Sequence, residues 1–305
     1  MPGPTTRADE VDIDPSLVRR LLAAQHPLWA SLPIRPVPSA GTDNAIYRLG
    51  DALAVRLPRR PGAVACLEKE LQWLPRIGPG LPLDVPAPIA AGEPGEGFPW
   101  PWYVYPWLEG DNATQSPVRD FDHAAQALAA FLTALQNVNT TGGPGPGYHN
   151  FNRGERLANR DAFTRAGIAS LPPDFNQATL TDAWEAALAL PEWEGAPVWI
   201  HGDLHPGNLL VTRGRLSGVI DFGGLGIGDP ACDLMVGWNL FSADARAVFR
   251  AELPPVDEAT WARGRGWALS VWVGGVAYYA EKYPAFAAMS RHTLAQVLAE
   301  YTDGP

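Results

Sequence analysis

Residues 200–221, IHGDLHPGNLLVTRGRLSGVID, decide how the chain arranges its polar groups. Within this stretch, residues 209–211 and 216–220 are apolar and predict two short strands, and Arg213-Gly214 between them is typical of a turn. A hairpin of this kind brings three polar side chains to one rim, namely Asp203, Asn208 and Asp221. Oxygens of Asp and Asn grouped in this way are the ligands that Mg²⁺ prefers, usually together with phosphate oxygens and water. A carboxylate that binds no metal can accept a proton from a hydroxyl group.

The composition is that of an ordinary globular protein. The chain has 305 residues, of which 46% are hydrophobic and 18% charged, enough for one large domain or two lobes. No apolar run reaches the roughly 18 residues needed to cross a membrane, and the acidic segment 1–14 predicts no signal peptide. The two cysteines, Cys66 and Cys232, are far apart and predict no disulfide scaffold. We therefore expect a cytoplasmic protein without a membrane partner.

The net charge of −10 argues against a nucleic acid as the main partner. The charge is uneven, because residues 1–105 carry 11 acidic and 10 basic side chains whereas residues 106–305 carry 22 and 13. The second part therefore favours a cationic ligand, although a solvated acidic surface explains the same count. Only Lys69 and Lys282 are lysines, so a fixed cation must come mainly from arginine.

The first part of the chain is rich in predicted strands. Residues 45–49 and 53–57 predict a hairpin closed by Gly50-Asp51, and residues 88–92 and 103–108 predict two further strands.

Arg56 lies inside the second strand of this hairpin, where a cation needs a partner because an unpaired buried charge is costly. The predicted helix 64–74 follows and carries Glu68 and Glu70. A glutamate paired to Arg56 would orient the guanidinium toward a phosphate, or the pair is only structural. The small polar segment 39–44 before the hairpin offers N–H groups to phosphates, or it is an ordinary turn.

The second part of the chain is mainly helical. Apolar spacing predicts helices over residues 118–136, 155–166, 180–190, 243–252, 260–283 with an interruption at 274–275, and 285–301. Together with the strand-rich first part, this order predicts an α+β fold of two lobes, residues 1–107 and 108–305.

Three spaced motifs resemble the aminoglycoside phosphotransferase family: HGDLHPGN at 201–208, IDFG at 220–223 and GDPACDL at 228–234. That family is similar to the eukaryotic protein kinases in fold and includes macrolide and choline kinases. The resemblance implies a β-rich N-terminal lobe that binds a nucleotide and a mainly α-helical C-terminal lobe that carries catalysis and the acceptor.

The resemblance also implies roles for single residues. Asp203 matches the catalytic carboxylate that accepts the proton of the acceptor hydroxyl or orients it, and Asn208 and Asp221 match the two Mg²⁺ ligands. The loop over the nucleotide phosphates corresponds to Ser39, Gly41, Thr42 and Asn44. The hinge that binds the purine through its backbone corresponds to Tyr105, Pro106 and Leu108. Pro106 has no N–H group, so Leu108 is the expected donor.

One position departs from the kinase pattern, because Arg56 stands where lysine is usual. The strand VRLPRR is similar to that of macrolide phosphotransferases, and arginine is a competent phosphate ligand. We prefer Glu70 over Glu68 as its partner.

Other polar residues near the motifs are expected to be structural. We expect His201 to hold the loop, His205 to be a loop residue without chemistry, and Asp229 to cap a helix. Asp233 is expected in the first turn of that helix, where a carboxylate favours the helix dipole, and it is also a candidate to brace the loop or to contact the acceptor. Tryptophans 261, 267 and 272 are expected in the core and in groove walls.

The sequence predicts an O-phosphotransferase that moves the γ-phosphate of ATP or GTP, with Mg²⁺, to a hydroxyl of a small molecule. The acidic second part favours an acceptor of the aminoglycoside type. The alternative is a macrolide or metabolite kinase with a choline-like or sugar-like acceptor, which Arg56 and the Trp-rich helices favour. A nucleotide-binding pseudokinase is the third reading, against which the intact Asp203, Asn208 and Asp221 argue.

Overall fold

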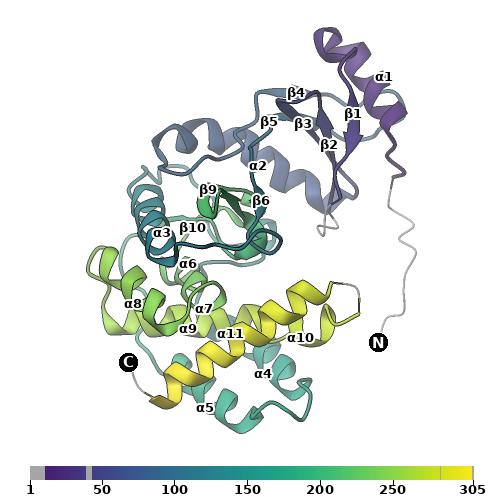
Figure 1. Cartoon of the computed structure of the whole chain (residues 1–305). Helices are drawn as coiled ribbons and strands as arrows, with labels where there is room; N and C mark the ends of the chain where they lie inside the picture. The colour runs from purple at the N-terminus through teal and green to yellow at the C-terminus, as the bar shows by residue number, and fades with distance from the viewer. Residues whose placement is uncertain (1–10, 39–42, 282, 304–305) are drawn as a thin grey trace. The chain divides into compact units, whose positions relative to one another are not determined.

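The computed structural model describes residues 11–38, 43–281 and 283–303 (Figure 1). Within this part of the chain there are two compact units. The first runs to Pro79 and includes Asp84–Glu109, and the second comprises Gly80–Leu83 and the chain from Gly110 onward. No helix among the described residues is both long and apolar enough to cross a membrane.

The first unit is built on one antiparallel sheet with the strand order β1-β2-β3-β5-β4. Its strands are β1 (Ile34–Pro36), β2 (Asn44–Leu49), β3 (Leu53–Pro58), β4 (Ala90–Gly92) and β5 (Trp102–Pro106). The β2–β3 turn contains Gly50 at φ +59°, a left-handed conformation that glycine adopts without strain. In β3, Arg56 lies opposite Ile46 on one side and Tyr103 on the other, so it is held in the middle of the sheet.

Two helices accompany this sheet, α1 (Pro15–Gln25) and α2 (Pro61–Ile77), with short 3₁₀ turns at Pro27–Trp29 and Gly78–Gly80. Helix α1 begins where Asp14 accepts a hydrogen bond from the Leu17 N–H, with proline at the first helical position. Its apolar face joins the inner faces of β2 and β3 in one core that also contains Phe98 and Trp102.

The second unit is mainly helical. Its longer helices are α3 (Phe121–Gln136), α4 (Asp161–Ala169), α5 (Gln177–Leu188), α8 (Ala243–Glu252), α9 (Glu258–Trp272) and α11 (Pro284–Asp303). The short ones are α6 (Ala231–Leu234), α7 (Val236–Asn239) and α10 (Gly275–Tyr278), and 3₁₀ turns lie at Tyr148–Asn150, Leu157–Arg160, Pro206–Asn208 and Phe222–Gly224. Helix α3 packs on α8, α6 on α9, and α10 on α11. The expected tryptophans are buried here, Trp267 completely and the other two nearly so.

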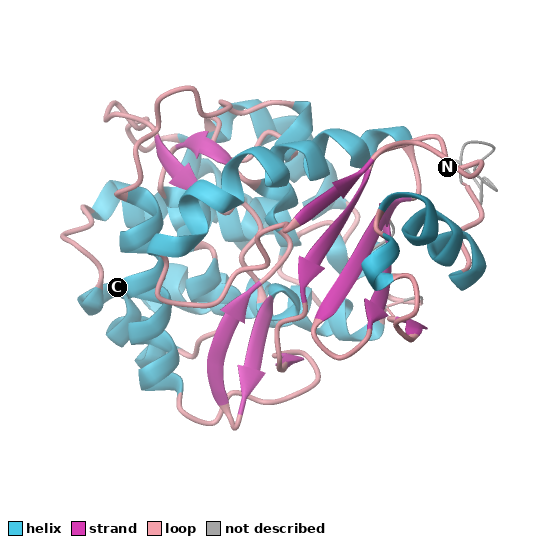
Figure 2. Cartoon of the chain, turned by 90° about the horizontal axis from the view of Figure 1, so that it is seen from above, coloured by secondary structure: helices cyan, strands magenta, loops and turns pink. Residues whose placement is uncertain are grey.

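Two small sheets lie among these helices, and Figure 2 shows strands as magenta arrows. Strands β6 (Asp111–Asn112), β8 (Leu209–Thr212) and β9 (Arg215–Val219) form one sheet, and β7 (Val198–Ile200) pairs with β10 (Gly226–Gly228) in the other. The predicted β8–β9 hairpin is confirmed. Its turn residues Arg213 and Gly214 both have positive φ, the backbone of the tight turn that matches the twist of paired strands.

The helix predicted over 155–166 was placed too early. A 3₁₀ turn at Leu157–Arg160 precedes α4, which runs from Asp161 to Ala169. Arg160 is buried and its Nε donates to Ser270 Oγ in α9 at 2.7 Å. This tertiary contact fixes the turn, and local helical spacing does not predict it.

Candidate functional site

The loop from His201 to Asn208 is held from within the second unit by Asp233. This carboxylate is completely buried and accepts hydrogen bonds from the N–H groups of His201 and Gly202, both at 2.7 Å. Burial raises the pKa of Asp233 to about 7. With its oxygens bonded to the loop and no exposed surface, Asp233 braces the loop, and the geometry favours this role over an acceptor contact.

Two further residues fix the loop conformation. His201 is completely buried, accepts the Asp203 N–H on Nδ1 at 3.2 Å and has Nε2 3.1 Å from the Ile220 carbonyl. Burial lowers the pKa of His201 to about 4, so the ring is neutral at pH 7, as a structural histidine requires. Gly202 has φ +81°, and a Cβ atom there would lie 2.4 Å from the Gly224 carbonyl oxygen. A side chain at this position would force the loop to move.

Asp203 stands at the surface of this braced loop, with 30% of its side chain exposed. Asn208 Nδ2 donates to the Asp203 carbonyl at 2.9 Å and lies 3.4 Å from Oδ2. Two side chains flank the carboxylate: Arg153 Nη2 is 3.5 Å from Oδ1 and His205 Nε2 is 3.5 Å from Oδ2. Burial alone would raise the pKa of Asp203, but His205, Arg153 and His201 together hold this pKa well below its usual range.

Asn208 and Asp221 lie at the same end of the β8–β9 hairpin. The Ile220 N–H donates to the Asn208 carbonyl at 2.9 Å, and Leu209 pairs with Val219. Asp221 is exposed and has φ +62°, a left-handed conformation that non-glycine residues adopt rarely, aspartate and asparagine more often than most. The hairpin thus places both predicted metal ligands on one rim.

The oxygens of Asn208 and Asp221 suit a Mg²⁺ ion whose other ligands are phosphate oxygens and water. Asn208 turns its amide nitrogen to Asp203, which leaves Oδ1 for a cation. Asp221 Oδ1 accepts a long hydrogen bond, 3.4 Å, from the Gly223 N–H. Among the described residues no group of three His, Cys, Asp or Glu side chains could hold a metal. Two protein oxygens completed by phosphate and water fit the habit of Mg²⁺.

The first unit carries a second polar cluster around Arg56. Its Nη1 donates to Glu70 Oε2 at 2.7 Å, and the Tyr105 hydroxyl donates to the same oxygen at 3.0 Å. The guanidinium carbon lies 5.3 Å from the centre of the Tyr105 ring. Glu70 is completely buried whereas Glu68 is exposed, so the structure resolves the choice of partner in favour of Glu70. Burial and the Glu70 carboxylate raise the pKa of Tyr105 well above its usual value.

Only some of the other residues expected to contact the nucleotide are among the described residues. Ser39, Gly41 and Thr42 are outside the described residues. Asn44 begins β2, and its Oδ1 is buried without a partner among the described side chains and backbone groups. Pro106 ends β5, and in the described part of the chain the Leu108 N–H makes no hydrogen bond. The Leu108 N–H is therefore available as a donor, and its contact with the purine stays a prediction.

Three side-chain contacts near this loop were not predicted from the sequence. His205 was expected to be without chemistry, yet its Nε2 faces Asp203. Arg153 comes from a loop 50 residues upstream. Asp229 accepts the Ala231 N–H, as a cap does, but it is also paired with Arg263 through Oδ2 at 2.8 Å and Oδ1 at 3.3 Å. No spacing in the sequence predicts these partners. Two of the contacts join segments that are distant in the chain, and the third lies within an irregular loop.

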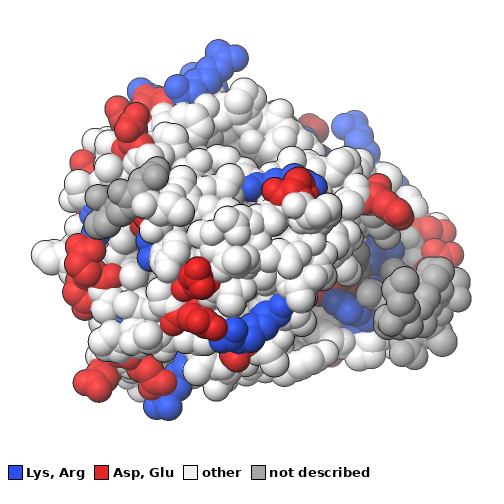
Figure 3. Space-filling model, turned by 90° about the horizontal axis from the view of Figure 1, so that it is seen from below, with Lys and Arg blue, Asp and Glu red and all other residues white. Residues whose placement is uncertain are grey.

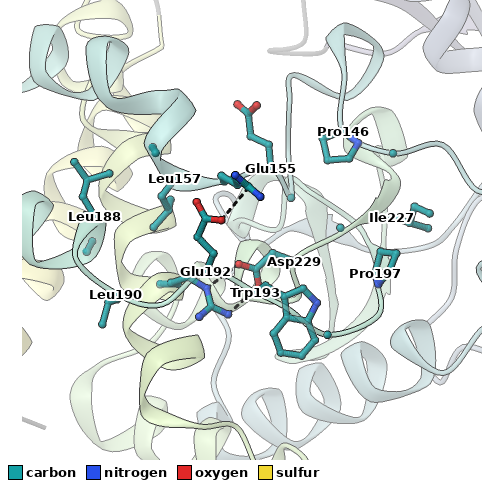
Figure 4. Close-up of a pocket in the computed structure, with 18 residues that line it drawn as sticks. Pro146, Glu155, Leu157, Leu188, Leu190, Glu192, Trp193, Pro197, Ile227 and Asp229 are labelled. Carbon is teal, nitrogen blue, oxygen red and sulfur yellow. Dashed lines mark hydrogen bonds and ion pairs between the residues drawn. The ribbon is translucent and has the colours of Figure 1, made fainter.

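The second unit also contains a cavity of about 320 Å³ (Figure 4). Trp193, Leu157 and the Asp229–Arg263 pair line it, and Arg156 is paired to Glu192 at its side. The Arg263 nitrogens bond to Asp229, Pro191 and Thr260, so its donors are used within the protein. Asp203, Asn208 and Asp221 do not line this cavity.

The charged surface of the second unit is mixed. In the view of Figure 3, acidic and basic side chains lie side by side among uncharged ones. Arg165 contacts both Asp161 and Glu185, and Arg291 contacts Asp174. Some of the 22 acidic side chains counted in residues 106–305 are therefore paired locally with arginine, which leaves the net excess unchanged.

Comparison with known proteins supports the motifs and the fold. The model of the phosphotransferase enzyme family matches residues 34–267. Two aminoglycoside 3'-phosphotransferases from Escherichia coli are 30% identical over 145 residues and 29% identical over 121 residues. These matches cover 45% and 39% of this chain and 52% and 43% of the relatives, so the chain matches only about half the length of either relative.

Solved structures share the fold over nearly the whole chain. The GDP complex of an aminoglycoside 2'-phosphotransferase-IIIa has a TM-score of 0.71 at 18% identity and covers 93% of this chain and 99% of its own. A macrolide 2'-phosphotransferase from Brachybacterium faecium has a TM-score of 0.59 at 21% identity, with 95% and 98% covered. The predicted α+β, protein-kinase-like fold is confirmed, with strands concentrated in the N-terminal part and helices in the C-terminal part.

Proposed function

The chain belongs to the phosphotransferase enzyme family, and from this premise we propose that it transfers the γ-phosphate of ATP or GTP to a hydroxyl group of a small molecule in the cytoplasm. In this proposal residues 1–107 form the nucleotide-binding lobe and residues 108–305 the catalytic and acceptor-binding lobe. The observation that carries the proposal is the placement of Asp203 on a loop whose backbone is fixed, with Asn208 bonded to it.

Asp203 acts on the acceptor hydroxyl. Because its pKa is held low, the carboxylate is charged at neutral pH and is a weak base. It accepts a hydrogen bond from the hydroxyl and aims the oxygen at phosphorus. Strong base catalysis is not needed, because the transition state of phosphoryl transfer is loose and positioning supplies most of the rate.

The remaining polar groups hold the nucleotide. Arg56, oriented by Glu70, donates to phosphate oxygens, and the Leu108 N–H donates to the purine. Bound Mg²⁺ would neutralise charge on the phosphate oxygens. Asn208 and Asp221 are the side chains we propose to hold it.

For the acceptor we propose an aminoglycoside-type antibiotic, since the Escherichia coli relatives bear that name and residues 106–305 are acidic. A second candidate, a less polar acceptor of the macrolide type, is favoured by aromatic rings near Asp203. His205 packs against Trp272 and Phe286, and Phe286 against Tyr279. A ring surface of this kind suits an acceptor with a large apolar face.

The test measures phosphate transfer from ATP and from GTP with Mg²⁺ to a panel of aminoglycosides, macrolides, choline and simple sugars. Transfer to at least one hydroxylated acceptor is expected. Transfer that weakens as salt rises identifies a polycationic acceptor, whereas transfer insensitive to salt identifies the less polar class. Nucleotide binding without transfer to any acceptor would overturn the proposal and favour a pseudokinase.

A further inference from the structure

We propose that His205 is a positioning residue, which donates a hydrogen bond from Nε2–H to Asp203 and, opposite Arg153, fixes the plane of that carboxylate. The inference rests on the proposed function of Asp203 as the group that orients the acceptor hydroxyl. Each carboxylate oxygen then has its own donor, Oδ1 facing Arg153 and Oδ2 facing His205, both at 3.5 Å.

The tautomer of His205 follows from its other nitrogen. The Gly207 N–H donates to Nδ1 at 3.0 Å, so Nδ1 carries a lone pair and no proton. The ring proton is then on Nε2, which is the nitrogen that faces Asp203. Turning the ring over would place Cδ2 and Cε1 where the two nitrogens lie and would lose both contacts. The backbone of the loop thereby determines which atom His205 presents to the carboxylate.

The ring has little freedom to leave this position. Its side chain is only 7% exposed, and Trp272 at the end of α9 and Phe286 in α11 meet it edge-on, with ring centres 5.3 and 5.5 Å away. Gly207 closes a third side, since a Cβ atom there would lie 2.7 Å from His205 Cε1. Helices α9 and α11 therefore fix the His205 ring, and the ring in turn contacts Asp203. A change in the packing of these helices would reach the carboxylate through the His205–Asp203 contact.

Arg153 completes the arrangement from the opposite side. Its Nε donates to the Gly202 carbonyl at 2.8 Å, which ties the guanidinium to the same loop. The segment before it is locally strained, because Phe151 and Asn152 both have left-handed φ values. A separation of 3.5 Å is long for a hydrogen bond, and such contacts commonly shorten when a substrate binds.

Two substitutions at His205 separate positioning from a purely structural role. His205→Gln places an amide near Nε2 and can still donate to Asp203. His205→Asn places its oxygen near Nδ1, where it can still accept the Gly207 N–H and begin the 3₁₀ turn, but it cannot reach Asp203. For transfer to the best acceptor, His205→Asn should lower kcat about 10- to 100-fold with KM for nucleotide within about twofold. His205→Gln should retain kcat within about fivefold of wild type.

The matched control is His292, which is exposed on α11, the helix that contributes Phe286. His292→Asn and His292→Gln should leave kcat unchanged. If His205 only caps the turn, the order reverses: His205→Asn keeps full kcat and His205→Gln loses it. That reversal, or equal kcat values for both variants, would overturn the inference.

A second measurement does not depend on any acceptor. In protein labelled with ¹⁵N-histidine, the His205 ring should show a protonated Nε2 and an unprotonated Nδ1, and Asp203→Asn should shift the Nε2 resonance. A protonated Nδ1 with a bare Nε2 would refute the contact. If transfer is never found but the NMR result holds, the proposed function fails while the contact stands. If transfer is found and the kcat order reverses, only the inference fails.

Discussion

The two units handle charge in opposite ways. In the first, the group that the proposed function offers to a ligand is a cation, Arg56, and a completely buried glutamate holds it. In the second, the group offered is an anion, Asp203, and Arg153 and His205 hold it. In both, the offered group is more exposed than its holders: 12% against 0% in the first, and 30% against 11% and 7% in the second. A buried counter-ion behind an accessible charge fixes direction without blocking contact.

The largest effect is expected where the offered group itself is removed. Asp203→Ala should lower kcat about 10³-fold or more while the nucleotide Kd changes less than about threefold, because in the proposed function Asp203 contacts the acceptor and not the nucleotide. Acceptor kinetics and nucleotide titration measure the two quantities. Arg165→Ala, at an exposed ion pair, is the control and should leave both unchanged. Activity that survives Asp203→Ala would contradict the proposal that Asp203 is the group that acts on the acceptor in the second unit.

The holder in the first unit should matter next. Glu70→Gln keeps the shape but removes the charge that orients Arg56, so kcat/KM for nucleotide should fall about 10- to 100-fold. The acceptor KM should change little. Glu68→Gln, two residues away on the exposed side of α2, is the matched control. A similar loss in both variants would mean that the α2 surface as a whole, and not the buried pair, determines nucleotide binding.

How much the sequence predicts differs between these clusters. The Arg56–Glu70 pair could be predicted because both residues lie in regular elements only 14 positions apart, and strand and helix periodicity limits the partners. The Asp203 loop and the β8–β9 hairpin could be predicted from turn residues and the spaced motifs. The two residues that contact the Asp203 carboxylate, Arg153 and His205, could not be predicted. Arg153 lies in an irregular loop, and the direction of His205 depends on Trp272 and Phe286, which reach it only after the helices pack.

The smallest predicted effect is on the free energy of unfolding, and it comes from His201 in the loop from His201 to Asn208. His201 is completely buried with its pKa lowered to about 4, against about 6.5 in an unfolded chain. The folded state therefore binds fewer protons than the unfolded state between these values. The contribution of neutral His201 to the free energy of unfolding should be fully present above pH 6.5 and should decline as pH falls toward 4. Between pH 7 and pH 5 the loss should be about 2 kcal/mol.

Urea unfolding of wild type and His201→Gln at pH 7 and pH 5 isolates this contribution, because glutamine does not titrate. Asp233, whose pKa is raised to about 7, acts with the opposite sign, favouring the folded state as pH falls through the same range. It is present in both proteins, so it cancels when the pH dependence of one is subtracted from that of the other. Wild type should lose about 2 kcal/mol more than the variant. Equal losses would mean that His201 is protonated in the folded loop, and its bond from the Asp203 N–H could not then form as described, since Nδ1 would carry a proton.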